Sequence, residues 1–314
     1  MGRRLDKKRS RRLGYMYSSP MGIWFTVFFV IPLLIIITYS FLEKGLYGGV
    51  VNKFSLGAYK SMFKSSFMLV TLRTLWISVL STAICIFIAI PCGYAMARKK
   101  KHQTFFLAAV IIPFWTNSLI RIYSWINILS TDGFLNNLLL KLHIISSPLS
   151  LIYNQGAVIL VLVYMFLPFA ILPLFTIIDK FDFSLLDAAR DLGATKLESI
   201  LLVMLPNIKS GITTSLVFTF IPIFGSYTVP LLVGGMDSTM VGNIIVDQVQ
   251  KTRNWPLAAA FSVILTALSM IGVLWMMSAS SKEEEKSKSI PSAKRVALNV
   301  KKHHQKEGQS NERR

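Results

Sequence analysis

The chain of 314 residues is 53% hydrophobic and only 16% charged, and its mean hydropathy is +0.54. Because soluble domains carry about 25% charged residues, this composition excludes a wholly soluble protein and indicates a membrane protein. The net charge of +19 would suggest a nucleic-acid partner for a soluble chain; here it is explained by basic residues retained on the cytoplasmic side, and we expect no nucleic acid to bind.

Six segments are long and apolar enough to cross a bilayer as helices, each of which needs about 20 residues. In chain order they are 21–41, 74–97, 104–120 continuing past Arg121 towards Leu129, 156–178, 211–233 and 256–277. The first follows seven basic residues, as a signal peptide does, but its apolar core is longer and no small-residue cleavage site follows. We expect an all-α membrane protein with a basic arm (1–20), a six-span domain (21–277) and a disordered basic tail (278–314).

The distribution of basic residues between the connections predicts the orientation of the chain in the membrane. The N-terminal arm, the loops 98–101 and 179–210 and the C-terminal tail carry 25 Lys and Arg, whereas the alternate connections carry 8. Both termini are therefore expected in the cytoplasm. In the outer connection 43–73, apolar residues at helical spacing after Ser55 predict a short interfacial helix.

Residue types and motifs that are absent from the sequence exclude several classes of function. No Asp or Glu lies inside a span, and all four histidines lie in loops or the tail, which disfavours a proton-driven carrier. The chain has no G-x-x-x-x-G-K-[ST] loop, no H-E-x-x-H motif and no Ser, His and Asp set within one apolar region. Cys85 and Cys92 share one helix face and indicate neither a disulfide nor a metal site. We therefore expect no catalytic residue, metal or cofactor in this chain.

The loop 179–210 is long for a connection in a compact membrane protein, which is typical of a functional segment. Ser184 with Asp187 matches a capping box and predicts a helix over 185–192, which Gly193 ends by taking the left-handed conformation.

A second capping box, Thr195 with Glu198, predicts a second helix over 196–205, which Pro206 interrupts. In the first helix, Ala188 and Ala189 would expose nearly bare backbone that another protein could approach closely. A solvated loop that only joins two spans is the alternative interpretation.

This loop resembles the signature of the inner-membrane permeases of binding-protein-dependent ABC importers. That signature reads Glu-Ala-Ala, three residues, Gly, nine residues, then Ile-x-Leu-Pro. The chain has Asp187, Ala188, Ala189, Gly193 and the run Val-Met-Leu-Pro at 203–206, at the same spacing. It departs from the signature in Asp for Glu and in Val for Ile.

The resemblance implies a type I ABC importer permease fold in a bacterial cytoplasmic membrane. It also implies that 179–210 is a coupling loop that docks on a dimer of ATP-binding subunits, which would bind ATP and Mg themselves. The implied coupling residues are Asp187, Ala188, Ala189, Gly193, Leu205 and Pro206.

Over residues 20–277 the chain is similar to the B-type permease subunits of spermidine/putrescine importers. The similarity is carried by the stretches 113–123 and 190–196, by Gly234 and Gly235, and by 253–256. It implies polyamine transport with a second permease, the ATPase dimer and an external polyamine-binding protein as partners, besides membrane lipid. A permease for another small solute, or an ion-driven carrier, is the alternative.

Five polar or aromatic residues are candidates for the substrate path: Trp115, Asn117, Arg121, Tyr227 and Asp247. The aromatic residues could instead be interfacial anchors, the arginine could reach the outer interface, and the carboxylate could simply be solvated. Breaks at Pro222, Gly225 and Pro230 could offer carbonyls to a cation, or could only assist packing.

Overall fold

The structure, a computed structural model, describes residues 19–288, with side chains described for 19–274, 277 and 278. Most of the predicted arm and the tail beyond 288 lie outside this range. The chain divides into two compact units. The first contains residues up to Leu69 together with Ile244–Leu268, and the second contains Val70–Asn243 and the residues from Ser269 onward.

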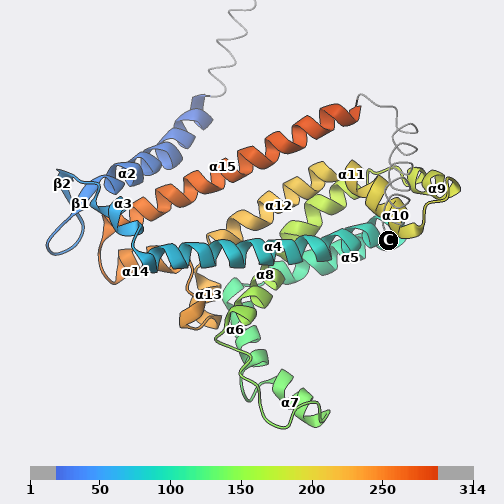
Figure 1. The fold of residues 1–314 in the computed structure, drawn as a ribbon, viewed down its shortest axis with the longest axis horizontal. Helices are drawn as coiled ribbons and strands as arrows, with labels where there is room; N and C mark the ends of the chain where they lie inside the picture. Colours follow the sequence, from blue (N-terminus) through green and yellow to red (C-terminus); the bar gives the residue numbers. More distant parts are fainter. Residues whose placement is uncertain (1–18, 289–314) are drawn as a thin grey trace, which may run out of the picture. The chain divides into compact units, whose positions relative to one another are not determined.

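In the first unit, one helical stretch covers the first predicted span, from Ser19 to Ser40 (Figure 1). It consists of a helical turn, the π-helical segment η1 (Thr26–Val30) and helix α2 (Ile31–Ser40). A hairpin of β1 (Leu42–Lys44) and β2 (Val50–Phe54) follows, so the expectation of an all-α chain needs a correction in this connection. The glycines Gly48 and Gly49, with φ of 97° and 77°, supply the turn, and the β-branched Val50 and Val51 favour a strand.

The short helix predicted after Ser55 is confirmed as α3 (Gly57–Met62). The Ser55 hydroxyl accepts a hydrogen bond from the Gly57 N–H at 3.1 Å. The Tyr59 hydroxyl lies 2.8 Å from that of Ser40, which ties α3 to the end of α2. Parts of three further helices belong to this unit, namely α4 (Ser65–Arg98) up to Leu69, α14 (Val241–Gln250) from Ile244, and α15 (Trp255–Lys288) up to Leu268.

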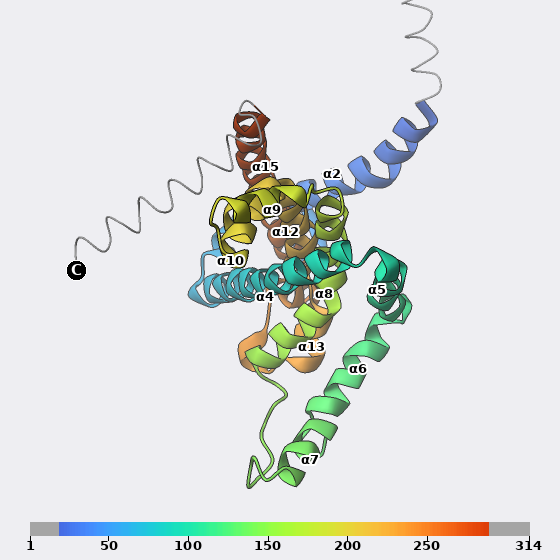
Figure 2. The ribbon, with the colours of Figure 1, turned by 90° about the vertical axis from the view of Figure 1, so that its right-hand side faces the viewer.

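The second unit is built on α4, α8 and α12, which lie side by side in Figures 1 and 2. The helical segments from Ser65 to Ser238 are α4 (Ser65–Arg98), η2 (Lys100–His102), α5 (Gln103–Ile111), η3 (Ile112–Trp115), α6 (Ser118–Leu129), α7 (Phe134–Lys141), α8 (Gln155–Ile178), α9 (Ser184–Asp191), α10 (Lys196–Ser199), η4 (Ile200–Met204), α11 (Leu205–Asn207), α12 (Lys209–Phe224), α13 (Thr228–Val233) and η5 (Met236–Ser238).

Small residues let α8 approach its two neighbours closely, as is usual for helices packed in a membrane. A Cβ on Gly211 of α12 would lie 2.9 Å from Ile177, and one on Gly93 of α4 would lie 3.1 Å from Ile178. Between these helices the buried side chains form one apolar cluster that extends to α9 and η4. The loop 179–210 is therefore packed onto the ends of the spans.

Four described helices are long and apolar enough to cross a membrane, and the number is six if each of two bent pairs counts as one span. The third predicted span is bent by 92° between Lys100–Trp115 and Ser118–Lys141. The fifth predicted span, 211–233, is broken at Gly225 as expected, because α12 ends at Phe224 and α13 is separate, whereas Pro222 and Pro230 lie inside these helices. Helix α12 follows Lys196–Asn207 at an angle of 72°.

Both π-helical segments precede a proline by two residues. η1 ends two residues before Pro32, and η4 ends two residues before Pro206. Because proline has no N–H and its ring collides with the preceding turn of an α-helix, a widened turn there lets the helix continue.

Helix α15 ends at Lys288, so the first residues of the segment predicted to be disordered are helical. This stretch reads Ser-Lys-Glu-Glu-Glu-Lys from Ser281, and Lys and Glu are good helix formers that can extend a span into water. The prediction placed the start of the disordered tail at the end of the apolar sequence, but the helix continues beyond that point.

Candidate functional site

The first helix of the loop, α9, begins differently from the prediction. Ser184 is its first residue and caps nothing, so the predicted box of Ser184 with Asp187 is wrong. The Asp182 carboxylate accepts the Ser184 N–H at 3.0 Å. Hydrogen bonds from the hydroxyl and the backbone N–H of Ser184 hold the pKa of Asp182 below its usual value. Asp187 pairs instead with Arg190, at 3.2 Å between Oδ1 and Nη1.

The prediction that Gly193 ends this helix is confirmed. Gly193 has a φ of +93°, its N–H donates to the Arg190 carbonyl at 2.8 Å, and the Ala194 N–H donates to the Ala189 carbonyl at 3.1 Å. This pair of bonds is a Schellman motif, which satisfies the last carbonyls of a helix. No atom lies within 4 Å of a Cβ built on Gly193, so backbone conformation rather than space requires glycine there.

The second capping box is confirmed as well. The Thr195 hydroxyl accepts the Glu198 N–H at 3.3 Å, and the Glu198 carboxylate accepts the Thr195 N–H at 2.7 Å. Pro206 does not interrupt the helix as predicted, since the helical segment continues to Asn207. The π-helical η4 accommodates the proline, and the bend follows at Ile208.

The two alanines of the signature differ in exposure. Ala188 is exposed, whereas Ala189 is fully buried, so the expectation that both expose backbone is wrong for Ala189. Ala189 belongs to the same apolar cluster as Ala194 and Met204, which come from the following turn and from η4. Its small side chain therefore allows close packing within the loop rather than contact with another protein.

Three exposed leucines were not among the predicted residues. Leu192, Leu197 and Leu201 are 55%, 66% and 49% exposed. Leu197 lies four residues before Leu201, and Ala188 lies four residues before Leu192, so each pair shares one side of a helical segment. We call these four residues the loop face. A loop that only joins two spans does not require exposed apolar residues. Leucines at this spacing in such a loop are therefore the sequence signal that would have identified the loop face.

The residues predicted for the substrate path divide into separate groups. Trp115, at the end of η3, is 81% exposed, and the Asn117 side chain caps α6 by accepting the Leu119 N–H at 2.8 Å. Arg121 is only 9% exposed, and its guanidinium lies 5.4 Å from the ring centroid of Phe114. All three residues lie at or next to the 92° bend of the third span.

Tyr227 lies at the second break, between α12 and α13. Its carbonyl accepts the Leu231 N–H at 3.0 Å and the Asn243 side-chain amide at 2.8 Å, so this carbonyl is occupied by the protein. A Cβ on Gly242 would lie 2.8 Å from the Ser226 carbonyl, which shows how closely this segment approaches the break. At this break, the Tyr227 carbonyl therefore contributes to packing within the protein.

Asp247 belongs to the other unit. Its carboxylate lies 2.8 Å from Nζ of Lys251, one helical turn later. The carboxylate is thus paired within α14 and 43% exposed.

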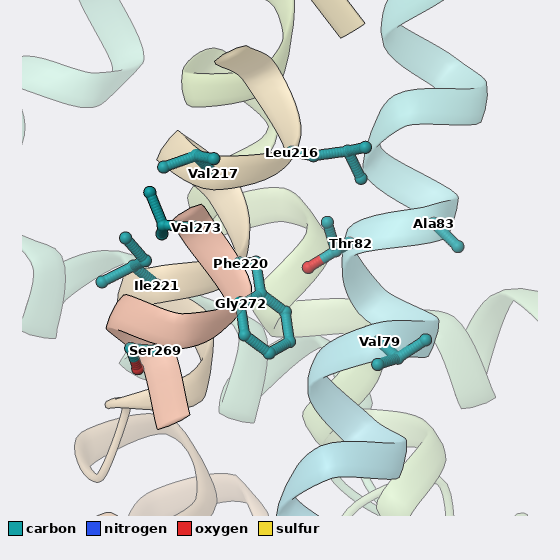
Figure 3. A pocket seen from close by; sticks show the side chains of 10 residues that line it. All are labelled: Val79, Thr82, Ala83, Leu216, Val217, Phe220, Ile221, Ser269, Gly272 and Val273. Carbon is teal, nitrogen blue, oxygen red and sulfur yellow. The ribbon is translucent and has the colours of Figure 1, made fainter. Parts of the chain in front are cut away.

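An apolar cavity of about 420 Å³ lies between α4, α12 and the part of α15 that belongs to the second unit (Figure 3). None of the five predicted path residues lines it. Figure 3 shows Phe220, Leu216 and Thr82 around it, with Gly272 on α15 contributing no side chain.

Comparison with known proteins gives consistent results. The family described as "Binding-protein-dependent transport system inner membrane component" matches residues 86–282. The spermidine/putrescine transport system permease protein PotB of Escherichia coli (strain K12) is 37% identical over 81% of this chain and 94% of that protein. PotB of Haemophilus influenzae is also 37% identical, over 78% and 86%. The inner membrane ABC transporter permease protein YdcU of Escherichia coli is 32% identical, over 68% and 72%.

Two solved structures share the fold. One is a bacterial ABC transporter involved in the import of the acidic polysaccharide alginate, with a TM-score of 0.70 over 89% of this chain and 99% of that chain at 18% identity. The other is a bacterial alginate ABC transporter in complex with a periplasmic protein, with a TM-score of 0.69 over 86% and 94% at 20% identity. At these identities the likeness confirms the expected fold alone.

Proposed function

The chain belongs to the family of binding-protein-dependent transport system inner membrane components, and we propose that it forms half of the translocation path of a polyamine importer. As an ABC importer permease it transports rather than catalyses. Spermidine and putrescine are proposed as substrates because relatives named for them match most of this chain at 37% identity.

The observation that carries the coupling mechanism is the turn at Gly193. It joins two short helices through a Schellman motif and a capping box, and it leaves the loop face exposed beside it. Apolar residues on an ordered, compact loop are suited to docking in a groove of another protein. In the proposal that protein is a dimer of ATP-binding subunits, which supplies the ATP and Mg.

The coupling residues have different roles in this proposal. Ala188 and the three leucines contact the ATP-binding subunit, while Gly193 and Ala189 fix the shape of the loop. Leu205 and Pro206 are half-buried and connect the loop to α12. Because one apolar cluster joins the loop to α4 and α8, a displacement of the docked loop would move these spans as rigid bodies.

The orientation in the proposal follows the basic residues. Segments with 25 Lys and Arg lie in the cytoplasm with both termini, and segments with 8 lie outside. The loop 179–210 is then on the cytoplasmic side, where ATP is available, and the external binding protein meets the opposite face.

The polyamine is not attracted by this chain alone. The outer connections are net basic, Asp247 is paired with Lys251, and Arg121 is itself a cation. Aromatic faces such as Trp115 remain available for cation–π contact. Carboxylates of the second permease and of the binding protein supply the rest of the attraction in this proposal.

Uptake of labelled spermidine and putrescine by cells deleted for this chain, with and without its plasmid-borne copy, tests the proposal. Uptake restored by the plasmid, inhibited by unlabelled polyamine and unaffected by excess amino acids or sugars is expected. Inhibition by another solute instead would favour a permease for that solute. Transport by the purified chain alone under an ion gradient, without ATP, would favour an ion-driven carrier.

A further inference from the structure

Arg121 is a buried cation without a counter-charge among residues 19–288. Its side chain lies in the first turns of α6 and points back across the bend to the ring of Phe114. Only 9% of the residue is exposed, and its Nε is enclosed without a hydrogen-bond acceptor among the residues that the structure describes. An aromatic face offsets part of the lost hydration, but a guanidinium next to hydrocarbon needs an anion or several acceptors.

The described chain does not supply that anion. None of its carboxylates forms an ion pair with Arg121, and no predicted span contains Asp or Glu. Carboxylates of the described residues pair with other cations: Glu43 with Lys53, Asp237 with Arg73, Asp187 with Arg190, and Asp247 with Lys251. The counter-charge of Arg121 therefore comes from outside the described chain.

The surroundings of Arg121 indicate the kind of partner. One side of α6 packs against α8 and α13, where Ile122 and Leu129 are buried, and the remaining surface of η3 and α6 is exposed. Trp115, Ile120 and Tyr123 are 81%, 64% and 54% exposed there. Arginine among tryptophan and tyrosine is the composition of an energetically important protein–protein contact.

The polar residues of the same helices also favour a protein partner. Ser124 and Asn127 on α6 and Asn137 on α7 are exposed alongside the apolar side chains. Lipid tails cannot bind hydroxyl or amide groups, whereas a protein surface can.

We propose that Arg121 forms an ion pair with an Asp or Glu carboxylate of the second permease subunit, at the surface formed by η3 and the start of α6. The inference rests on the proposed function, because it takes the partner from the importer and excludes the cationic polyamine as the counter-charge. The pair would connect the two halves of the transporter at the bend of the third span.

Photo-cross-linking in the intact importer identifies the partner without disturbing Arg121. A benzophenone amino acid replaces Ile120 or Tyr123, and cross-linked peptides are identified by mass spectrometry. Cross-links to a segment of the second permease that contains Asp or Glu are expected. Cross-links only to lipid or only to this chain would overturn the inference.

Charge reversal tests the pair itself. In Arg121→Glu, the second permease that co-purifies with the tagged chain should fall at least about ten-fold, because two buried carboxylates would then face each other. Arg121→Lys should retain part of the assembly. The matched control is Lys64→Glu, which reverses an exposed cation and should assemble normally. Second-site revertants of Arg121→Glu that restore uptake should replace an acidic residue of the second permease.

The outcomes separate the two proposals. If the wild-type chain assembles with a second permease and Arg121→Glu assembles equally well, only the ion pair is refuted. Loss of co-purified phospholipid in Arg121→Glu with full assembly would assign the counter-charge to a lipid phosphate and likewise refute the pair. If the wild-type chain itself never co-purifies with a second permease, both proposals fail.

Discussion

The backbone N–H of Ala194 donates a 3.1 Å hydrogen bond to the carbonyl of Ala189 across the turn at Gly193. Both alanines are buried in the cluster that also contains side chains of α4 and α8. The two residues that form this hydrogen bond therefore also attach the loop to the spans. A substitution of Ala189 or Ala194 should affect coupling.

Gly193→Val should uncouple ATP hydrolysis from uptake. A β-branched residue at a φ of +93° costs about 1–3 kcal/mol, so the turn would adopt another conformation. Uptake should fall about ten-fold or more at that cost, while the chain still inserts. Gly193→Asn is the matched control, because asparagine tolerates the left-handed region, and it should retain most uptake. Equal, normal uptake by both variants would argue against a role for this turn.

Ala189→Leu and Ala188→Leu should fail for different reasons. Leucine at the fully buried position overpacks the cluster and should destabilise the purified chain by about 1–3 kcal/mol. At the exposed position it should leave the thermal unfolding temperature unchanged but weaken binding of the ATP-binding subunit. Thermal unfolding in detergent and co-purification measure the two effects. An unchanged unfolding temperature in Ala189→Leu would contradict the observed packing.

Leu197→Asp should reduce co-purification of the ATP-binding subunit without loss of stability. The side chain is 66% exposed, so a carboxylate there meets water in the free chain and an apolar groove in the complex. Truncating or charging a central contact residue costs at least about 2 kcal/mol of binding. Leu46→Asp is the control, since Leu46 is 92% exposed in the hairpin of the other unit. Similar losses in the two variants would contradict docking at the loop face.

Asn243→Ala should destabilise the break between α12 and α13. The Asn243 amide donates to the Tyr227 carbonyl at 2.8 Å, and its oxygen accepts the Met240 N–H at 3.1 Å. The Tyr227 carbonyl keeps the Leu231 N–H, but the buried Met240 N–H loses its acceptor. An unsatisfied buried N–H costs about 1–3 kcal/mol, which should lower the unfolding temperature. Asn137→Ala removes an exposed amide and should be neutral. If both variants unfold at the wild-type temperature, the break is held by other contacts.

Gly272→Ala should stabilise the chain. Glycine inside a helix costs about 1 kcal/mol relative to alanine, and no atom lies within 4 Å of a Cβ built there because it faces the cavity of Figure 3. An increase in the unfolding temperature is expected. Gly211→Ala is the contrasting variant, since its Cβ would lie 2.9 Å from Ile177, and it should be destabilising. A decrease for Gly272→Ala would mean that the cavity is filled in the membrane.

Local features of the loop followed from sequence because each depends on residues close together in the chain. The box of Thr195 with Glu198 spans three residues, and the turn at Gly193 closes over five. The box assigned to Ser184 failed for a similar local reason, because Asp182 lies two residues earlier and competes for the same N–H. The sequence contains the capping-box pattern twice. Only the backbone geometry distinguishes the box that forms, at Thr195, from the one that does not, at Ser184.

The sequence by itself determined the membrane class, the number of apolar segments and the position of the helical loop 179–210, because hydrophobic length and short-range hydrogen bonding are properties of contiguous residues. Only the tertiary structure decided that Ala189 is buried while Ala188 is exposed, that the third span bends by 92°, and that Arg121 is enclosed without an anion. Each of these depends on helices that are distant in sequence and pack against one another, and a linear pattern contains no information about which neighbour fills which face.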